Sequence, residues 1–281
     1  MKSVKTIFAP AKVNLCLHVL GKRDDGYHDL AMIMQRVSLY DRLNVTLTPG
    51  MGVSVDCPGV DLAGDGVNIV EKAASLFFES LGLDQGVSIK IEKHIPAAAG
   101  LGGGSSDAAA VLEALHDLLD LNLSRAELIS IGARVGADVP FFLYKKTAWV
   151  TGVGDRLQPW PGMPPVTLVL VNPGVSVSTR KIFQNLGLTH QRPIARIPRF
   201  PVGTSGLVRL LHNDLEVVTC HHHPVITTIK ERLIASGAMG ALMSGSGATV
   251  FGVCADQLQA ESVAREIRRE ADWWVEIVNP I

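Results

Sequence analysis

The sequence lacks closely spaced cysteines. Its four cysteines, Cys16, Cys57, Cys220 and Cys254, lie far apart among 281 residues and form no Cys-x-x-Cys pair. Close spacing is the usual signature of a zinc site or a disulfide framework, so the sequence favours neither. We expect buried free thiols, as in proteins of the reducing cytoplasm, where disulfides are rare.

Two further features are missing: an excess of one charge and a long apolar run. The 26 basic and 27 acidic residues nearly cancel, so the sequence has no electrostatic signature of binding to nucleic acid or an anionic membrane. The apolar stretch 13–20 is interrupted by Asn14 and His18, unlike a signal peptide or a membrane span. We expect a cytoplasmic monomer or weak homodimer with no nucleic-acid or membrane partner.

Hydrophobic periodicity indicates strands and helices in alternation, as in a mixed α/β or α+β protein. Strands are predicted at 6–19, with an early break at Pro10, and at 36–47, 87–92, 166–171, 248–254 and 273–278. Helices are predicted at 67–81, 108–119, 124–135, 225–235 and 258–270, and a turn at 21–26. A loop is expected over 187–206. The Gly- and Pro-rich stretch 152–165 predicts a domain boundary, giving an N-terminal domain 1–155 and a C-terminal domain 156–281.

A glycine-rich segment carries the clearest chemical signal. The run PAAAGLGGGSSDAAA starts at Pro96, follows a predicted strand and opens a predicted helix. Glycine lets the backbone approach a ligand closely, and a helix N-terminus offers unpaired N–H groups and a positive dipole end. The segment is therefore typical of a phosphate site. Its expected ligand-binding residues are Pro96, Ala97, Ala98, Ala99, Gly100, Leu101, Gly102, Gly103, Gly104, Ser105 and Ser106.

Two common phosphate motifs do not fit this segment. No Gly-Lys-Ser/Thr follows the glycines, so it is not the usual P-loop. Asp117 and Asp120 follow Gly104 by only 13 and 16 residues, whereas a dinucleotide fingerprint places its acidic ribose ligand about 20 residues on. A flexible linker or a structural turn is the plain alternative, but the position between a strand and an alanine-rich helix argues against it.

Three segments together resemble the superfamily of galactokinases, homoserine kinases, mevalonate kinases and phosphomevalonate kinases. They are PAKVNL at 10–15, the glycine-rich segment, and SGSGATVF at 244–251. Further motifs resemble the branch that acts on a cytidyl diphosphate sugar alcohol of the non-mevalonate isoprenoid pathway. These are DGYH at 25–28, GADVPF at 136–141 and HNDLE at 212–216.

The resemblance implies both a fold and a reaction. The fold would have an N-terminal domain like ribosomal protein S5 domain 2 and a ferredoxin-like C-terminal domain, with the active site in the cleft between them. The reaction would transfer the γ-phosphate of ATP to the 2-hydroxyl of 4-diphosphocytidyl-2-C-methyl-D-erythritol, giving the 2-phosphate and ADP. ATP and Mg²⁺ are the expected cofactors, and Ser106 is a candidate Mg²⁺ ligand.

The resemblance assigns the chemistry to Lys12 and Asp138. A carboxylate at Asp138 can accept the proton of the hydroxyl as phosphoryl transfer proceeds; a helix cap is the plain alternative. Lys12 would keep Asp138 ionised and offset charge on the phosphoryl group. A lysine is costly in an apolar stretch, which favours this role over that of a surface lysine with a buried stem.

Substrate-binding positions follow from the same resemblance. Tyr27, His28 and Phe183 match a cytidine pocket, in which aromatic rings stack on the base and His28 reaches its edge. Asn14 and Thr179 match polar positions on the substrate side.

Other matches lie near the nucleotide. Asn68 matches a position near the adenine, and a helix N-cap role there is compatible with that. Gly245, Ser246 and Gly247 are predicted to form a second turn of close approach beside the glycine-rich segment.

Two other functions remain open at this point. A homoserine or mevalonate kinase-like activity is disfavoured by Tyr27 and His28, because those substrates have no base to stack. A non-catalytic nucleotide sensor is disfavoured because Lys12 and Asp138 are both present. The run His221–His223 suggests a metal site, but consecutive helical histidines point in different directions. We expect a solvated helix face there.

Overall fold

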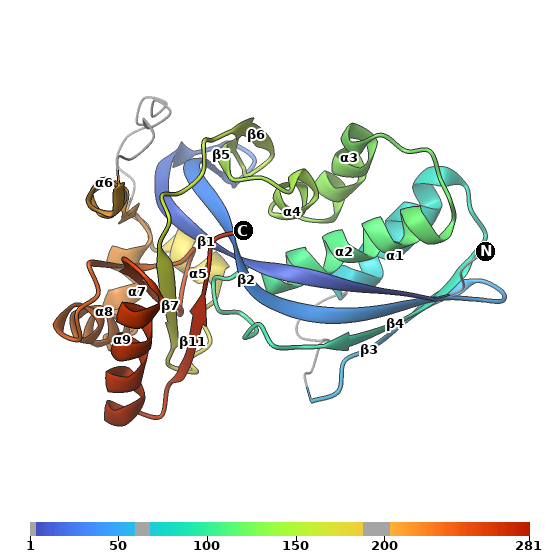
Figure 1. Cartoon of the computed structure of the whole chain (residues 1–281). Helices are drawn as coiled ribbons and strands as arrows, with labels where there is room; N and C mark the ends of the chain where they lie inside the picture. Colours follow the sequence, from blue (N-terminus) through green and yellow to red (C-terminus); the bar gives the residue numbers. More distant parts are fainter. Residues whose placement is uncertain (1–3, 60–67, 188–202) are drawn as a thin grey trace. The chain divides into compact units, whose positions relative to one another are not determined.

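The computed structural model describes residues 4–59, 68–187 and 203–281 (Figure 1). It divides into two compact units that interleave along the chain. The first unit comprises Met1–Ala11, Leu39–Ala97 and Gly102–Lys145, and the second comprises Lys12–Ser38, Ala98–Leu101 and Lys146–Ile281. The long strands β1 (Val4–Lys22) and β2 (His28–Thr48) each pass from one unit into the other. The boundary between residues 155 and 156 stays a prediction about folding domains.

The first unit packs helices against strands. Strand β3 (Gly52–Asp56) runs parallel to β4 (Gly86–Glu92), which pairs antiparallel with residues 42–48 of β2. The helices are α1 (Ile69–Leu81), α2 (Gly103–Leu118), α3 (Arg125–Val135) and α4 (Val139–Tyr144). They pack on one another on one side of β3 and β4 (Figure 1).

Local sequence signals explain where these helices begin and end. Asn68 accepts the N–H of Val70 at 2.9 Å and starts α1, and Gly82 ends it in the left-handed conformation. Ser124 and Glu127 form the predicted capping box of α3. Both helices match the prediction closely; residue 67 of the predicted range lies outside the described residues.

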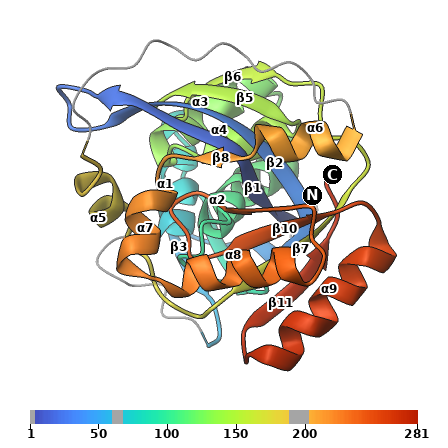
Figure 2. The same ribbon diagram turned by 90° about the vertical axis from the view of Figure 1, so that its left-hand side faces the viewer.

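The second unit contains a four-stranded antiparallel sheet in the order β11-β7-β10-β9. Its elements are β7 (Thr167–Asn172), α8 (Val225–Ala235), β9 (Gly240–Met243), β10 (Val250–Cys254), α9 (Gln257–Glu270) and β11 (Trp274–Val278). Helices α8 and α9 lie across the same face of this sheet (Figure 2). This order and connectivity confirm the expected ferredoxin-like arrangement and the α+β class.

The remaining elements of the second unit surround the ends of β1 and β2. Strand β5 (Ala148–Gly152) pairs antiparallel with residues 30–34 of β2 and with β6 (Arg156–Pro159). The short strand β8 (His212–Asn213) runs parallel to β1 at Cys16 and Leu17. Three short helices complete the unit: α5 (Thr179–Gln184), α6 (Gly203–Leu210) and α7 (Glu216–His222).

Two local predictions were wrong. Pro10 does not break the first strand, since β1 continues through it; the fixed φ of proline suits extended backbone and removes only one donor. Residues 203–206 of the expected loop begin helix α6, while 188–202 lie outside the described residues. The four cysteines are free, and Cys16, Cys57 and Cys254 are buried. None of the described helices is both long and apolar enough to cross a membrane.

Candidate active site

The N-terminus of α2 is built to receive an anion. Gly102 precedes the helix with φ 71°, and no described side chain caps it. The first helical hydrogen bond runs from the N–H of Ser106 to the carbonyl of Gly102 at 2.9 Å. The N–H groups of the preceding residues therefore have no acceptor within the helix, as at any helix start. Together with the dipole they favour a phosphate at this point.

Ser106 adds a hydroxyl with an unused hydrogen-bonding capacity. Its side chain is 1% exposed, and Oγ has no hydrogen-bond partner among the described residues. Leaving a buried hydroxyl unpaired costs about 1–3 kcal/mol. A phosphate oxygen or a phosphate-bound cation would satisfy this atom, so the residue fits its predicted place at the triphosphate.

The middle of the glycine-rich segment, Ala98–Leu101, lies against the turn after β9. Ser244 Oγ donates to the carbonyl of Gly100 at 2.9 Å, and the N–H of Thr249 donates to Ala99 at 3.1 Å. Gly100 has φ 76°, and a Cβ on it would lie 2.1 Å from the carbonyl oxygen of Ser244. This contact confirms the predicted second turn of close approach, where Gly245 faces the carbonyl of Gly100.

Lys12 is buried beside this turn. The residue is only 4% exposed. Its Nζ donates to Oδ1 of Asn14 at 2.6 Å, on the same face of β1. Its backbone N–H donates to Leu101 at 2.9 Å, and Nζ lies 3.4 Å from the place of a Cβ on Gly245. The alternative of a surface lysine is therefore wrong. A buried ammonium is expensive unless it serves an anion or a polar partner.

Asp138 stands at the start of α4 in the first unit. It is half-buried with φ −86° and ψ −11°, and its side chain caps no N–H of the helix. The alternative of a helix cap is therefore not realised. Lys12 belongs to the second unit.

Two of the residues predicted to bind cytidine, His28 and Phe183, lie together within the second unit. The rings of His28 and Phe183 lie 5.0 Å apart at 31°. Burial, with a smaller contribution from the charge of Lys22, lowers the pKa of His28 below 6.5, so its imidazole is neutral near pH 7. Tyr27 lies between the predicted turn 21–26 and His28 and is 65% exposed, which leaves its ring accessible to a ligand.

Three polar residues predicted to contact ligands, Thr179, Asn14 and Asn68, each make hydrogen bonds within the protein. Thr179 Oγ1 lies 2.8 Å from Oγ of Ser246, which ties α5 to the turn at Gly245–Gly247. Asn14 is 1% exposed, and its N–H donates to Oγ of Ser244 at 3.3 Å. Asn68 has the capping role already described, and its place near the adenine stays a prediction.

Sequence reasoning missed a buried charge cluster behind the start of α2. Lys93 Nζ bonds both Asp41 and Asp107, the latter at 2.8 Å. It also lies 3.1 Å from the place of a Cβ on Gly103. Asp41 Oδ1 accepts the N–H groups of His94 and Ile95 at 2.6 and 2.9 Å. The cluster thus braces the first turn of α2.

Asp107 is the less well stabilised of the two carboxylates in this cluster. One ammonium faces two buried carboxylates, and the backbone N–H groups support only Asp41. Burial, opposed by Lys93 and reinforced by Asp41, raises the pKa of Asp107 to about 7. In the sequence, Asp107 is only a polar residue near a predicted helix start. Nothing in that pattern indicates that it is buried.

Comparison with known proteins places these features in a family. Residues 68–146 match the GHMP kinases N terminal domain, and residues 206–272 match the GHMP kinases C terminal domain. A 4-diphosphocytidyl-2-C-methyl-D-erythritol kinase from Syntrophotalea carbinolica is 52% identical over 99% of both chains.

Solved structures agree with the sequence matches. The crystal structure of a 4-(cytidine 5'-diphospho)-2C-methyl-D-erythritol kinase aligns with a TM-score of 0.79 at 37% identity, covering 98% of this chain and 99% of the other. A homoserine kinase from Cytophaga hutchinsonii aligns with a TM-score of 0.75 at 19% identity, over 99% and 95% of the two chains; this likeness shows a shared fold alone.

The two domain matches, the glycine-rich start of α2 and the ferredoxin-like sheet together define a GHMP-type small-molecule kinase. Within that class, the chain belongs to the 4-diphosphocytidyl-2-C-methyl-D-erythritol kinase family.

Proposed function

We propose that this protein transfers the γ-phosphate of ATP to the 2-hydroxyl of 4-diphosphocytidyl-2-C-methyl-D-erythritol, giving the 2-phosphate and ADP for isoprenoid precursor synthesis. The identity of 52% over 99% of a relative with that kinase name supports the substrate. The observation that carries the chemistry is the burial of Lys12, which is joined through its backbone N–H to Leu101 of the glycine-rich segment.

The proposed chemistry divides between two side chains. Asp138 accepts the proton of the substrate hydroxyl, which makes a weak nucleophile competent for phosphoryl transfer. Lys12 places its positive charge on the transferring phosphoryl group, and Asn14 holds the ammonium in position at 2.6 Å. Charge placed in advance where it is needed in the transition state is the main source of catalysis in phosphoryl transfer.

The nucleotide is proposed to lie along residues Pro96–Ser106, with the phosphates at the start of α2 and Asn68 near the adenine. The unpaired Oγ of Ser106 fits a Mg²⁺ ion or a phosphate oxygen. Mg²⁺ bound with ATP would neutralise part of the triphosphate charge. The backbone N–H groups of the protein would orient the phosphates.

The acceptor is proposed to bind through its cytosine. The rings of His28 and Phe183, with the exposed ring of Tyr27, offer stacking surfaces for a pyrimidine. A neutral His28 imidazole can both donate to and accept from the base edge. Asn14 and Thr179 would contact polar groups of the substrate.

The proposal also covers the location, the oligomeric state and the partners of the enzyme. We expect it to act in the cytoplasm as a monomer or weak homodimer, without a nucleic-acid or membrane partner. The balance of 26 basic and 27 acidic residues supports the expectation of no nucleic-acid or anionic-membrane partner.

A coupled assay of ATP consumption tests the function. The purified protein is given Mg²⁺, ATP and one acceptor at a time: the cytidyl compound, homoserine or mevalonate. Turnover is expected with the cytidyl compound alone, and turnover with another acceptor in its place would overturn the substrate assignment.

Two variants test the proposed base in the same assay. Asp138→Asn should lose roughly 100- to 10,000-fold in kcat, the usual contribution of a general base. Asp56→Asn alters an exposed aspartate of the same unit and should keep wild-type kcat. Wild-type turnover by Asp138→Asn would remove the base from the mechanism.

A further inference from the structure

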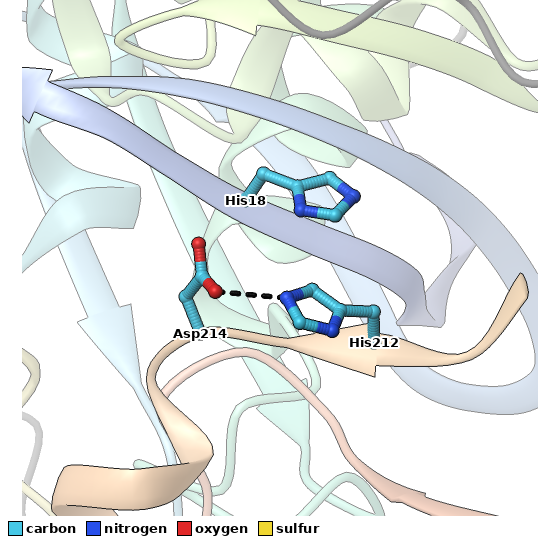
Figure 3. Close-up of side chains that lie close together, drawn as sticks. All are labelled: His18, His212 and Asp214. Carbon is cyan, nitrogen blue, oxygen red and sulfur yellow. Dashed lines mark hydrogen bonds and ion pairs between the residues drawn. The ribbon is translucent and has the colours of Figure 1, made fainter. Parts of the chain in front are cut away.

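Three potential metal ligands converge where β1 pairs with β8. His18 projects from β1, His212 from β8, and Asp214 follows β8 directly (Figure 3). One ligand atom from each lies within 4.8 Å of the others. The two imidazole rings stack with centroids 4.5 Å apart, and Nε2 of His212 lies 2.8 Å from Oδ1 of Asp214.

The backbone fixes this group of side chains. Strands β1 and β8 pair in parallel through Cys16 with His212. The N–H of Asp214 donates to the carbonyl of Leu17 at 3.0 Å. Its Oδ2 accepts the N–H of Val19 at 2.8 Å. The carboxylate is therefore held through one oxygen and turns the other towards His212, an arrangement that commonly orients metal-binding carboxylates.

We propose that His18, His212 and Asp214 bind a divalent transition-metal ion of the zinc type. Two imidazoles and one carboxylate form a ligand set that suits Zn²⁺ and other divalent first-row transition metals far better than Mg²⁺, which prefers oxygen ligands. His212 has a side chain 48% exposed, so solvent can reach the ion and a water can complete a tetrahedral shell.

The geometry needs side-chain adjustment to hold the ion. Ligand atoms about 2.0–2.2 Å from Zn²⁺ in a tetrahedron lie roughly 3.3 Å apart. The 2.8 Å contact between His212 and Asp214 would open by a few tenths of an ångström, and the other ligand-atom separations, which are at most 4.8 Å, would close by up to about 1.5 Å. Side-chain rotations supply these movements, because neither histidine is buried. The ion would take the place of the proton shared by these two groups.

The bound ion would link β1 to β8. Lys12 and Asn14 precede His18 on the same strand. The ion would therefore stiffen the strand that carries them without taking part in phosphoryl transfer. The site is independent of the proposed kinase function. A metal-free alternative is that the stacked histidines and the carboxylate hold the strands through hydrogen bonding alone, and binding measurements separate the two.

Calorimetry on the full chain, freed of metal with a chelator, tests the proposal. Titration with Zn²⁺ is expected to show one site, with an accompanying rise in melting temperature. His18→Gln, His212→Gln and Asp214→Asn should each weaken Zn²⁺ binding at least tenfold and abolish that rise. Circular dichroism of each metal-free variant identifies any that does not fold, and the folded variants decide the result.

The histidine run on α7 supplies the control. His222 is exposed on a different element, so His222→Gln should bind Zn²⁺ like the wild type. Co²⁺ gives a second measurement, since tetrahedral coordination produces strong visible absorption that His212→Gln should lose. Absence of binding to the wild-type chain, retention of binding in folded His212→Gln, or its loss in His222→Gln would each overturn the proposal.

Discussion

The ammonium of Lys12 lies 2.6 Å from the amide oxygen of Asn14, and both residues are buried, with exposed fractions of 4% and 1%. Alternation along β1 places the two side chains on one face. The N–H of Asn14 is itself anchored on Ser244 at 3.3 Å. The lysine is thus positioned by the strand that carries it and by the turn that holds the glycine-rich segment.

Replacing Asn14 should impair catalysis through Lys12. A hydrogen bond to a charged group contributes about 1.5–3 kcal/mol, and each 1.4 kcal/mol is about tenfold in rate. Asn14→Ala is therefore expected to lower kcat by roughly 10- to 100-fold in steady-state assays. Asn44→Ala is the control: Asn44 accepts a side-chain hydrogen bond from Thr6, at an exposed site, and its loss should leave kcat unchanged. Equal kcat for Asn14→Ala and wild type would separate Asn14 from the function of Lys12.

Two glycines with the same backbone conformation allow a clean test of the close approach at the glycine-rich segment. Gly100 and Gly174 both have φ 76°. A Cβ on Gly100 meets the Ser244 carbonyl at 2.1 Å, while one on Gly174 meets no described atom within 4 Å. Gly174→Ala should cost about 1–2 kcal/mol in the free energy of unfolding, the strain of the left-handed conformation.

Gly100→Ala carries the same strain and a collision with backbone. Overpacking adds about 1–3 kcal/mol, so urea denaturation should show a clearly greater loss of stability than for Gly174→Ala. The displaced segment should also weaken ATP binding, measured by calorimetry. Equal losses for the two variants would show that the segment does not depend on contact with Ser244.

The ring pair of His28 and Phe183 predicts a selective effect on the acceptor. Stacking of a base on an aromatic side chain contributes about 1–3 kcal/mol. Phe183→Leu is expected to raise the KM of the cytidyl substrate roughly 10- to 100-fold and to leave the KM of ATP unchanged. Phe183→Tyr keeps the ring and should restore most of the affinity. Parallel changes in both KM values would indicate a general disturbance of α5.

Short-range signals in the sequence predicted much of this protein. The caps Asn68 and Ser124 placed two helices closely, and the glycine-rich segment was predicted to open a helix, which begins as α2 at Gly103. These features depend on residues a few positions apart. Lys12 was also predicted to be more than a surface lysine, and it is buried. A lysine within an apolar stretch is costly unless its charge serves a function.

Features that depend on distant residues were not predicted. The cluster of Asp41, Lys93 and Asp107 exists because a strand end and a helix start are packed together, and no local pattern signals it. His18 and His212 meet only through the pairing of β1 with β8. Among the adjacent histidines at 221–223, the rings of His221 and His222 lie 5.3 Å apart in an edge-to-face contact at the end of α7.

The buried cluster makes stability depend on pH in a defined direction. The pKa of Asp107 is raised from 3.8 to about 7 in the folded protein, so between these values the folded state holds a proton that the unfolded state releases. Stability from this group is complete below about pH 4 and is lost as pH rises through about 7. Asp107→Asn removes the titrating group while keeping its shape.

Urea denaturation from about pH 4 to pH 8, without nucleotide, measures this effect. The free energy of unfolding of the wild type should decline relative to that of Asp107→Asn as pH rises across this window, and the difference should level off above about pH 7. Asp56→Asn, at an exposed position, should run parallel to the wild type throughout. A difference between wild type and Asp107→Asn that stays constant with pH would mean that Asp107 is ionised in the folded protein, with Lys93 outweighing burial.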